Sequence, residues 1–361
     1  MPDGVVNQTK SSRVPGSVIQ SSAGGRLSSV DVVRGIAIIL MVFGHTEQGG
    51  NHRHWWDAFP RFFPFINFAD SFIYSFHMAA FFVLSGLFVV AAIARCGPLG
   101  LTGERVRVLL YPYLLWGLIH GLTDPLTAPF RVNVEPFSLR HLVIGLLNGS
   151  SSWFLPTLFL CGVLASLVRF VPAWLQISIA LCGSLFASFS GDYPRSLETI
   201  YETLRYFPFL LIGMVIGAKR FAQVETLSRK RSFAGFAILL AFQIVAIWKV
   251  GDSPRVAFVP LGLTGTAMLV LLASCIRGTR ASAVLRWSGE ASIAIFLIAP
   301  IMQGTGRELV LRLLHSTHPL PQLLVPVVLA TVVPALLWHG RQMLHLNWLF
   351  RWPSHNKAGT A

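Results

Sequence analysis

The first apolar segment of the chain carries an arginine and a histidine whose spacing has chemical meaning. Arg34 and His45 are eleven positions apart within residues 30–47. In an α-helix this separation is about three turns plus 20°, so both side chains lie on one stripe, roughly 16 Å apart along the axis. An imidazole that titrates near neutrality can act as a base or a nucleophile, and a guanidinium binds anions. One helix face therefore carries both functions at its two ends.

The same residues also have a plain structural explanation. Arg34 can extend to the headgroups at one membrane surface while His45 lies in the interface at the other. Asp31, three residues after Ser28, is placed to complete a capping box, and Arg34 follows it by one turn as an ion partner. The residue types alone leave both interpretations open.

The composition indicates where this helix lies. Of the 361 residues, 53% are hydrophobic and 12% are charged, with a mean hydropathy of +0.62, whereas a soluble domain carries roughly 25% charged residues. Apolar runs near the ~20 residues needed to cross a bilayer recur along the chain. We predict an all-α, polytopic transmembrane bundle of about ten spans, at residues 30–47, 70–94, 106–122, 151–169, 174–190, 199–218, 232–249, 257–276, 288–303 and 321–340.

The positive charge fits a membrane protein better than a nucleic-acid-binding protein. The formal net charge is +14, but most of the 29 Lys and Arg residues fall on the N-terminal side when alternate loops are assigned to opposite faces. The positive-inside rule then places both termini in the cytoplasm, and we expect no nucleic-acid partner. We predict a disordered cytoplasmic tail, a membrane domain and a short cytoplasmic C-terminal tail, at residues 1–28, 29–346 and 347–361.

The cysteines indicate neither a disulfide framework nor a metal site. They are far apart, in or beside apolar runs, without the close pairing of a zinc site. We expect small core residues, and no metal, at Cys96, Cys161, Cys182 and Cys275.

Several short motifs follow one another from Asp31 to about Pro300. They are the Arg34 and His45 pair, the run from Phe76 to Gly86 that ends in Leu-Ser-Gly, the stretch from Arg107 to Tyr113 with its Tyr-Pro-Tyr, the Trp-Phe-Leu at 153–155, and the run from Arg205 to Gly213. In combination they resemble the acyltransferase 3 family of integral membrane acyltransferases, whose first helix carries an Arg or Lys, ten intervening residues and an essential His. Where a late family segment often has a His, this chain has Ala299.

The resemblance implies a membrane-bound O-acyltransferase with acyl-CoA as its donor and no permanently bound cofactor. It would transfer an acyl group, which we expect to be acetyl, to a hydroxyl of a cell-surface glycan or lipid-linked saccharide. Guanidinium groups at the cytoplasmic ends of the first spans suit the phosphates of coenzyme A, so we assign Arg34, Arg105 and Arg107 to the donor. The choice between Arg105 and Arg107 stays open, and ordinary positive-inside charge explains them equally well.

Two histidines are the expected catalytic residues. His45 is the first candidate, as either base or nucleophile, and His77 is a second that orients or assists it. His77 follows Asp70 by seven residues, so we expect these two on one face of the second span. A buried His hydrogen-bonded to a neighbour explains His77 equally well.

Four residues are candidates for binding the acceptor. Asp70 lies near the outer end of its span beside the histidines. Glu202 and Arg205, three positions apart, are predicted to pair in the bundle interior, in an outer half that suits hydroxyl recognition. Trp153 either stacks on a sugar or belongs to the aromatic belt at the membrane surface, and we favour the belt.

Two other classes of protein would share these features. A proton-coupled secondary transporter of a sugar or glycoside would use His45 and the Glu202–Arg205 pair as ionisable groups. A membrane protein without a site would use Arg34 and His45 only to anchor its helices. The resemblance favours the enzyme.

Overall fold

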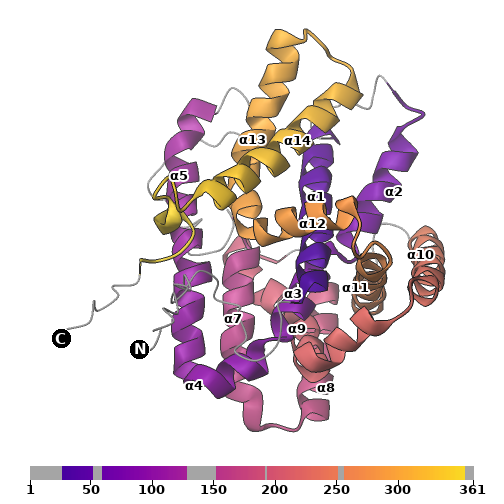
Figure 1. Ribbon diagram of the computed structural model, residues 1–361, viewed down its shortest axis with the longest axis vertical. Coiled ribbons are helices and arrows are strands. Elements are labelled where there is room, and N and C mark those ends of the chain that lie inside the picture. Colours follow the sequence, from indigo (N-terminus) through magenta and orange to yellow (C-terminus); the bar gives the residue numbers. More distant parts are fainter. Residues whose placement is uncertain (1–26, 52–58, 128–151, 192, 251–255, 354–361) are drawn as a thin grey trace, which may run out of the picture.

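The computed structural model describes residues 27–51, 59–127, 152–191, 193–250 and 256–353, and this part of the chain is helical with no strand. The predicted all-α fold is therefore confirmed (Figure 1). In chain order the elements are α1 (Ser28–Asn51), α2 (Phe63–Tyr74), α3 (His77–Gly86), α4 (Val89–Arg105), the π-helix η1 (Val106–Leu110), α5 (Tyr111–Thr127), α7 (Phe154–Leu167), η3 (Val168–Phe170), α8 (Ala173–Phe189), η4 (Arg195–Leu197), α9 (Glu198–Ala222), η5 (Gln223–Thr226), α10 (Arg229–Val250), α11 (Phe258–Cys275), α12 (Arg280–Glu290), α13 (Ser292–Leu313), α14 (Pro319–Gly340) and η6 (Asn347–Leu349).

Seven helical segments in the described ranges are long and apolar enough to cross a membrane. They are α1, α2 together with α3, α9, α10, α11, α13 and α14. This is fewer than the ten predicted, because α7 and α8 are shorter and the predicted span 106–122 is divided between η1 and α5. Large apolar side chains of α10, such as Ile238 and Trp248, are exposed, which suits contact with lipid rather than water. The chain is an integral membrane protein.

Helix α1 is the most buried of these seven segments, and α12 crosses it (Figure 1). The crossing depends on glycine at both contact points, because a Cβ on Gly35 would overlap the carbonyl of Leu285 and a Cβ on Gly289 would overlap the carbonyl of Asp31. The N-terminal end of α1 is also held by Glu225, which accepts hydrogen bonds from the backbone and hydroxyl of Ser29. These contacts fix α1 in the bundle. The predicted span 288–303 is wrong at its start, because residues 288–290 belong to α12, which ends at Glu290, and α13 begins at Ser292.

The predicted span 70–94 is not one helix. Helix α2 begins earlier, at Phe63, and the chain then breaks at Ser75–Phe76 and again at Leu87–Phe88 before α4. Phe76 has φ −143° and ψ −23°, outside the helical region. In Figure 1, α2 and α1 lie side by side while α4 turns away along the lower edge of the molecule. The break at Phe76 lies between Tyr74 and His77, so these two side chains do not follow one helical repeat.

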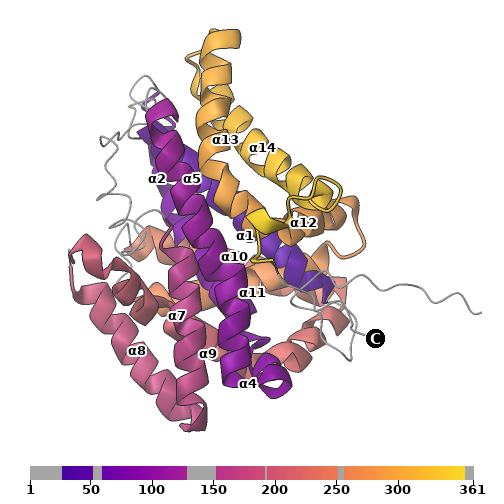
Figure 2. The ribbon, with the colours of Figure 1, turned by 90° about the vertical axis from the view of Figure 1, so that its left-hand side faces the viewer.

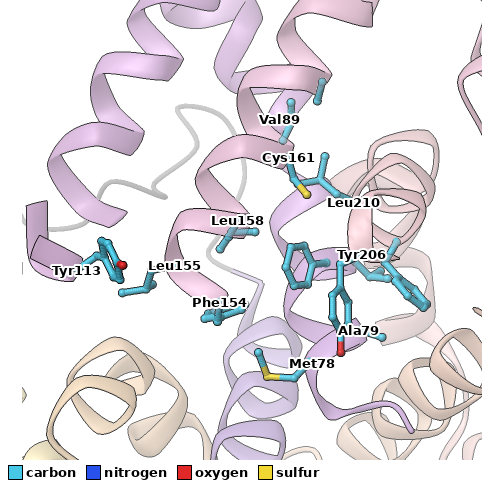
Figure 3. Close-up of a cluster of buried hydrophobic side chains, with 14 of the residues drawn as sticks. Met78, Ala79, Val89, Tyr113, Phe154, Leu155, Leu158, Cys161, Tyr206 and Leu210 are labelled. Atoms are coloured by element: carbon cyan, nitrogen blue, oxygen red, sulfur yellow. The ribbon is translucent and has the colours of Figure 1, made fainter. Parts of the chain in front are cut away.

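Helices α3, α7 and α9 share the main apolar core. In Figure 3, Met78 and Ala79 from α3, Phe154 and Leu158 from α7, and Tyr206 from α9 converge. Viewed from the side in Figure 2, α7, α8 and α9 form a group away from α13 and α14. This core includes side chains of α3, the helix that begins with His77.

The segment after α14 packs back onto the bundle. Phe350 is buried, Trp116 of α5 donates a hydrogen bond from Nε1 to the carbonyl of Leu349 at 2.9 Å, and the backbone N–H of Trp352 donates to the carbonyl of Arg107 at 3.1 Å. The predicted boundary between the membrane domain and the C-terminal tail, at residue 346, is therefore followed directly by a segment that packs on the bundle. The predicted N-terminal tail lies outside the described residues, apart from its last two positions.

Candidate active site

Helix α1 carries Arg34 and His45 on one unbroken helix, so the predicted stripe is present. Arg34 Nη1 lies 3.8 Å from Asp31 Oδ1, one turn back, which is the predicted ion pair. The side chain of His45 is exposed even though the next residue, Thr46, is fully buried. The imidazole thus borders open space while its helix is held in the core.

Tyr74, the last residue of α2, connects His45 to Asp70. Its hydroxyl oxygen lies 3.1 Å from His45 Nδ1, and the two rings meet edge to face with centroids 5.9 Å apart. The same hydroxyl donates to Gln48 Oε1 at 3.0 Å, and Gln48 Nε2 donates to Asp70 Oδ1 at 3.1 Å. Three hydrogen bonds therefore lead from the carboxylate of Asp70 to the imidazole of His45.

His77 lies on the other side of Tyr74, at the first position of α3. Its ring meets that of Tyr74 edge to face at 4.8 Å. Nδ1 lies 2.8 Å from the carbonyl oxygen of Ile73, so Nδ1 carries the proton that is donated. Nε2 is buried and has no hydrogen-bond partner in the described part of the chain. His77 therefore presents a second imidazole lone pair close to His45.

The prediction that Asp70 and His77 share one face of one helix is wrong. Asp70 belongs to α2 and His77 to α3, and the break at Phe76 lies between them. Both residues nevertheless reach Tyr74, His77 by ring contact and Asp70 through Gln48. Asp70 and His77 therefore meet at Tyr74 because of the break at Phe76, and the helical repeat alone does not predict this meeting.

A buried amide from a distant helix supports this break. Gln243 of α10 is fully buried, and its Nε2 donates to Ser75 Oγ at 2.8 Å and to the carbonyl of Leu261 at 3.3 Å. Its Oε1 accepts from Thr264 at 2.9 Å. Ser75 in turn donates to the carbonyl of Phe72 at 2.7 Å. Polar groups released by the interrupted helix are thus satisfied inside the bundle, as burial requires.

Arg105, one of the predicted donor-binding residues, is buried at the end of α4. Its Nη1 donates to the carbonyl of Leu158 at 2.9 Å and its Nη2 to Ser85 Oγ at 3.3 Å. Its guanidinium packs directly on Gly162, where an added Cβ would overlap it. No carboxylate pairs with it in the described ranges, and its Nε has no hydrogen-bond partner there. Arg105 thus joins α3, α4 and α7 as a buried cation.

Arg107, the alternative third-helix arginine, is exposed in η1. It lies near Arg351, and its backbone carbonyl holds Trp352. None of the contacts of Arg105 involves Arg34, which lies on α1 beside Asp31. The three predicted donor-binding arginines therefore occupy three separate settings: half-buried, buried and exposed.

Glu202 and Arg205 form the predicted pair on α9. Arg205 Nη1 lies 2.8 Å from Glu202 Oε1, and the hydroxyl of Tyr193 donates to the same oxygen at 2.7 Å. Arg205 also donates to the carbonyl of Ala187 at 3.4 Å, and its guanidinium lies over the ring of Phe258 with 5.7 Å to the centroid. The pair is thus held between α8, α9 and α11.

Trp153 is half-buried in an aromatic stack. Its ring lies nearly parallel to that of Tyr206, with centroids 5.2 Å apart, and Phe82 stacks on Tyr206 at 4.8 Å. The ring packs against the main apolar core, which is a different setting from the predicted aromatic belt at the membrane surface. Tyr206 and Phe258 also meet, so Trp153 and Arg205 belong to one aromatic group.

The structure thus gathers the predicted catalytic and acceptor-binding residues around two tyrosines and leaves the three predicted donor-binding arginines, Arg34, Arg105 and Arg107, apart from both groups. His45, His77 and Asp70 meet around Tyr74, whereas Trp153, Glu202 and Arg205 meet around Tyr206. Sequence reasoning missed Tyr74 and Gln48. Their spacings, four after Asp70 on α2 and three after His45 on α1, were the available signal. Within the described residues, no cluster of three His, Cys, Asp or Glu side chains could hold a metal ion.

Comparison with known proteins supports an enzyme of one family. Residues 27–339 match the sequence model of the acyltransferase 3 family, which is described as an acyltransferase domain. Two curated relatives are both called nodulation protein NolL. The protein from Sinorhizobium fredii (strain NGR234) is 31% identical over 225 residues, which is 60% of this chain and 56% of the relative. The protein from Mesorhizobium japonicum is 28% identical over 194 residues, which is 52% of this chain and 47% of the relative.

The chain spans about half the length of these curated relatives. No solved structure matches it significantly. The family match covers α1, α2 and α3, which carry the histidine group, and continues nearly to the end of α14. The predicted resemblance is confirmed, and the chain belongs to the acyltransferase 3 family of membrane acyltransferases.

Proposed function

We propose that the chain is an O-acetyltransferase of the bacterial cytoplasmic membrane. It moves an acetyl group from cytoplasmic acetyl-CoA to a hydroxyl of a cell-surface glycan or lipid-linked saccharide. The observation that carries the proposal is the continuous stripe of α1, with Arg34 near one end and an accessible imidazole at His45 about 16 Å along the axis. Membership of an acyltransferase family supports the reaction class.

The reaction joins an acceptor hydroxyl to the thioester. The hydroxyl oxygen attacks the carbonyl carbon of acetyl-CoA, and the imidazole of His45 takes the hydroxyl proton. The carbon–sulfur bond breaks, and the imidazolium returns the proton to the leaving thiolate, which gives an acetyl ester and free CoA. In the second route an imidazole nitrogen of His45 attacks the thioester carbonyl carbon and the carbon–sulfur bond breaks to release the CoA thiolate. The acceptor hydroxyl then takes the acetyl group from the imidazole, and its proton passes to the thiolate, which again gives an acetyl ester and free CoA. His77, whose ring contacts Tyr74 and whose Nε2 lone pair is buried, assists in either route.

The donor enters from the cytoplasm, where coenzyme A is found, and its anionic groups meet Arg34. The exposed guanidinium of Arg107 is suited to phosphate at the surface, and the buried cation of Arg105 to an anionic group that reaches further in. The ~16 Å stripe between Arg34 and His45 is of the order that a pantetheine arm bridges. The thioester would thus reach His45 while the nucleotide stays near the membrane surface.

The acceptor arrives from the opposite side of the membrane. Asp70 lies beside the histidines, and Glu202 with Arg205 supplies a carboxylate and a guanidinium that can bind sugar hydroxyls. The ring of Trp153 offers a face for a sugar.

The orientation that this reaction needs has both termini in the cytoplasm and ten spans. Ten crossings follow if the shorter apolar helices α7 and α8, together with η1 and α5, cross alongside the seven longer segments. The excess of Lys and Arg on the N-terminal side supports the orientation.

The proposal is tested with purified protein in lipid vesicles, by measuring thiol release from acetyl-CoA in the presence of candidate glycans. We expect His45→Ala to lower kcat by about 10²- to 10⁴-fold, the usual contribution of a general base. We expect Arg34→Ala to raise the KM for acetyl-CoA by about 10-fold or more, through loss of a charge-assisted contact. His315→Asn, at an exposed histidine with φ 45°, is the matched control, since Asn tolerates that backbone conformation.

Full acceptor-dependent activity in His45→Ala would contradict the proposed mechanism. Uptake of a labelled sugar into the vesicles without thiol release would instead favour the transporter. Labelling of wild-type protein by radioactive acetyl-CoA that is absent in His45→Ala would assign the covalent route.

A further inference from the structure

A chain of hydrogen bonds runs from Asp70 to His45 through two neutral side chains. The bond lengths are 3.1 Å from Gln48 Nε2 to Asp70 Oδ1, 3.0 Å from the Tyr74 hydroxyl to Gln48 Oε1, and 3.1 Å between Tyr74 Oη and His45 Nδ1. Gln48 and His45 are one turn apart on α1, while Asp70 and Tyr74 are one turn apart on α2. These hydrogen bonds therefore join α1 to α2 at two successive turns of each helix.

The direction of each hydrogen bond follows from which atoms can donate. A carboxylate only accepts, so the amide NH₂ of Gln48 must face Asp70 and its carbonyl must face Tyr74. That carbonyl also only accepts, so the single hydroxyl proton of Tyr74 is committed to Gln48. Tyr74 can then offer His45 only an oxygen lone pair. His45 Nδ1 must therefore carry a proton and donate it to Tyr74.

We infer that Asp70, Gln48 and Tyr74 are positioning residues that hold His45 in the Nδ1–H tautomer, so that its reactive lone pair is on Nε2. The inference rests on the proposed function of His45 as base or nucleophile. Nε2 has no hydrogen-bond partner in the described part of the chain, and the side chain is exposed. The only nitrogen left to react is thus the one that faces away from Tyr74.

The same series of hydrogen bonds, from Asp70 to His45, stabilises the imidazolium cation that forms on His45 during the reaction. When Nε2 takes a proton from the acceptor hydroxyl, Nδ1 keeps its proton and its bond to Tyr74, and no group needs to rotate. The negative charge of Asp70 stabilises the new positive charge on His45, because the hydrogen bonds between them are polarised. This assigns Asp70 a role different from the acceptor contact predicted from the sequence.

The end of α2 at Tyr74 serves the same arrangement. Tyr74 is the last residue of α2, and its ring packs edge to face on His45 and on His77. An uninterrupted helix would carry His77 past Tyr74 on the same helical surface. The break holds Tyr74 between both imidazoles, and the carbonyl of Ile73 gives His77 the same Nδ1–H tautomer.

The direct test is the tautomer of His45 in protein labelled with ¹⁵N-histidine in lipid vesicles, since the two tautomers have distinct ¹⁵N shifts at neutral pH. The signals of His45 are those missing from the spectrum of His45→Asn. We expect the Nδ1–H tautomer in wild type and a mixture of tautomers in Tyr74→Phe, which removes the oxygen acceptor but keeps the ring. A wild-type His45 with its proton on Nε2 would overturn the inference.

Steady-state kinetics provide the second readout. We expect Tyr74→Phe and Asp70→Asn each to lower kcat by about 10- to 100-fold, by analogy with residues that orient a metal-bound histidine, while the KM for acetyl-CoA changes less than about twofold. The matched control is Tyr201→Phe on α9, because the Tyr201 ring also packs on aromatic neighbours but its hydroxyl makes no hydrogen bond in the described structure. We expect wild-type kcat in this control.

The outcomes separate this inference from the proposed function. Loss of activity in His45→Ala with an unchanged tautomer and kcat in Tyr74→Phe would overturn the positioning role alone. Full activity in His45→Ala would overturn the proposed function. If Tyr74→Phe lowers kcat and also the melting temperature, Asp70→Asn, which keeps the shape of the side chain, must lower kcat with the melting temperature unchanged; otherwise the role is structural and the inference fails.

Discussion

Ionisable side chains inside an apolar bundle need hydrogen bonds or opposite charges in place of water. Glu202 illustrates this requirement: its side chain is 8% exposed and is held by both Arg205 and Tyr193. Arg205 is 26% exposed and has two further contacts, with Ala187 and Phe258. The pair is therefore intermediate between a surface ion pair and a fully buried one.

The stability of the bundle should depend on this pair. We predict that Arg205→Ala lowers the free energy of unfolding by about 2 kcal/mol, between the ~1 kcal/mol of an exposed pair and the ~3–5 kcal/mol of breaking a buried one. Thermal unfolding in detergent measures the effect. The control is Arg312→Ala, which removes an exposed i,i+4 contact with Glu308 and should cost less than about 0.5 kcal/mol. Equal shifts in the two variants would contradict the prediction.

At the scale of elements, the crossing of α3 and α9 gives a structural meaning to two of the motifs. Gly86, which ends the Leu-Ser-Gly motif, and Gly213 face each other, and a Cβ on either would overlap backbone atoms of the other helix, at Leu210 and Val83. Ser85 beside it accepts a hydrogen bond from Arg105. The motif thus packs α3 against α9 and ties it to α4.

Close packing at this crossing predicts a strong effect from one methyl group. We expect Gly86→Ala to destabilise the protein by about 1–3 kcal/mol or more, because the clash is with backbone and no side chain can move aside. Gly304→Ala in α13, where a Cβ meets no atom within 4 Å, should instead stabilise by about 0.5–1 kcal/mol, as expected for replacing glycine within a helix. Melting temperatures of the two variants that move in the same direction would refute this account.

The break between α2 and α3 predicts a link between a remote amide and catalysis. Gln243→Leu removes the donor that reaches Ser75 and should cost about 1–3 kcal/mol of stability, since Ser75 and Thr264 lose a buried partner. Because Tyr74 and His77 flank the break, we expect kcat to fall as well, by about 10-fold. The measurements are thermal unfolding and thiol release.

The control for this prediction is another amide that bonds to backbone carbonyls. Gln176 donates to the carbonyls of Val168 and Val171 at the turn between α7 and α8. We expect Gln176→Leu to lower the melting temperature while leaving kcat unchanged. A loss of kcat in proportion to stability in both variants would show that Gln243 has no special connection to the site.

At the scale of the whole molecule, the proposed orientation can be tested by labelling. Thr317 lies in the connection between α13 and α14, and Met343 follows α14; both are exposed. With the four native cysteines replaced by alanine, we expect Thr317→Cys to react with a membrane-impermeant maleimide in intact cells. Met343→Cys should react only after permeabilisation. The opposite pattern would reverse the topology and remove cytoplasmic acyl-CoA from the reach of Arg34.

Relations within one uninterrupted helix were predictable from the sequence alone. The stripe that joins Arg34 to His45 and the pair of Glu202 with Arg205 depend only on the helical repeat, and both are present. Composition was enough to establish an all-α membrane protein, since so few charged residues cannot cover a soluble surface. The order of the motifs was enough to recognise the family.

Only the tertiary structure decided the surroundings of His45. The break at Phe76 is stabilised by Gln243, 168 positions from its partner Ser75, and no local pattern contains that contact. Burial likewise separated Arg105 from Arg107, two arginines only two positions apart, because the side chain of Arg105 packs on Gly162 and bonds to Leu158 of α7 whereas that of Arg107 is exposed. Within an uninterrupted helix the sequence determined which residues share a face, whereas the packing of helices far apart in the chain decided where helices break, which hydrogen-bond donors and acceptors meet, and hence which nitrogen of His45 is free to react.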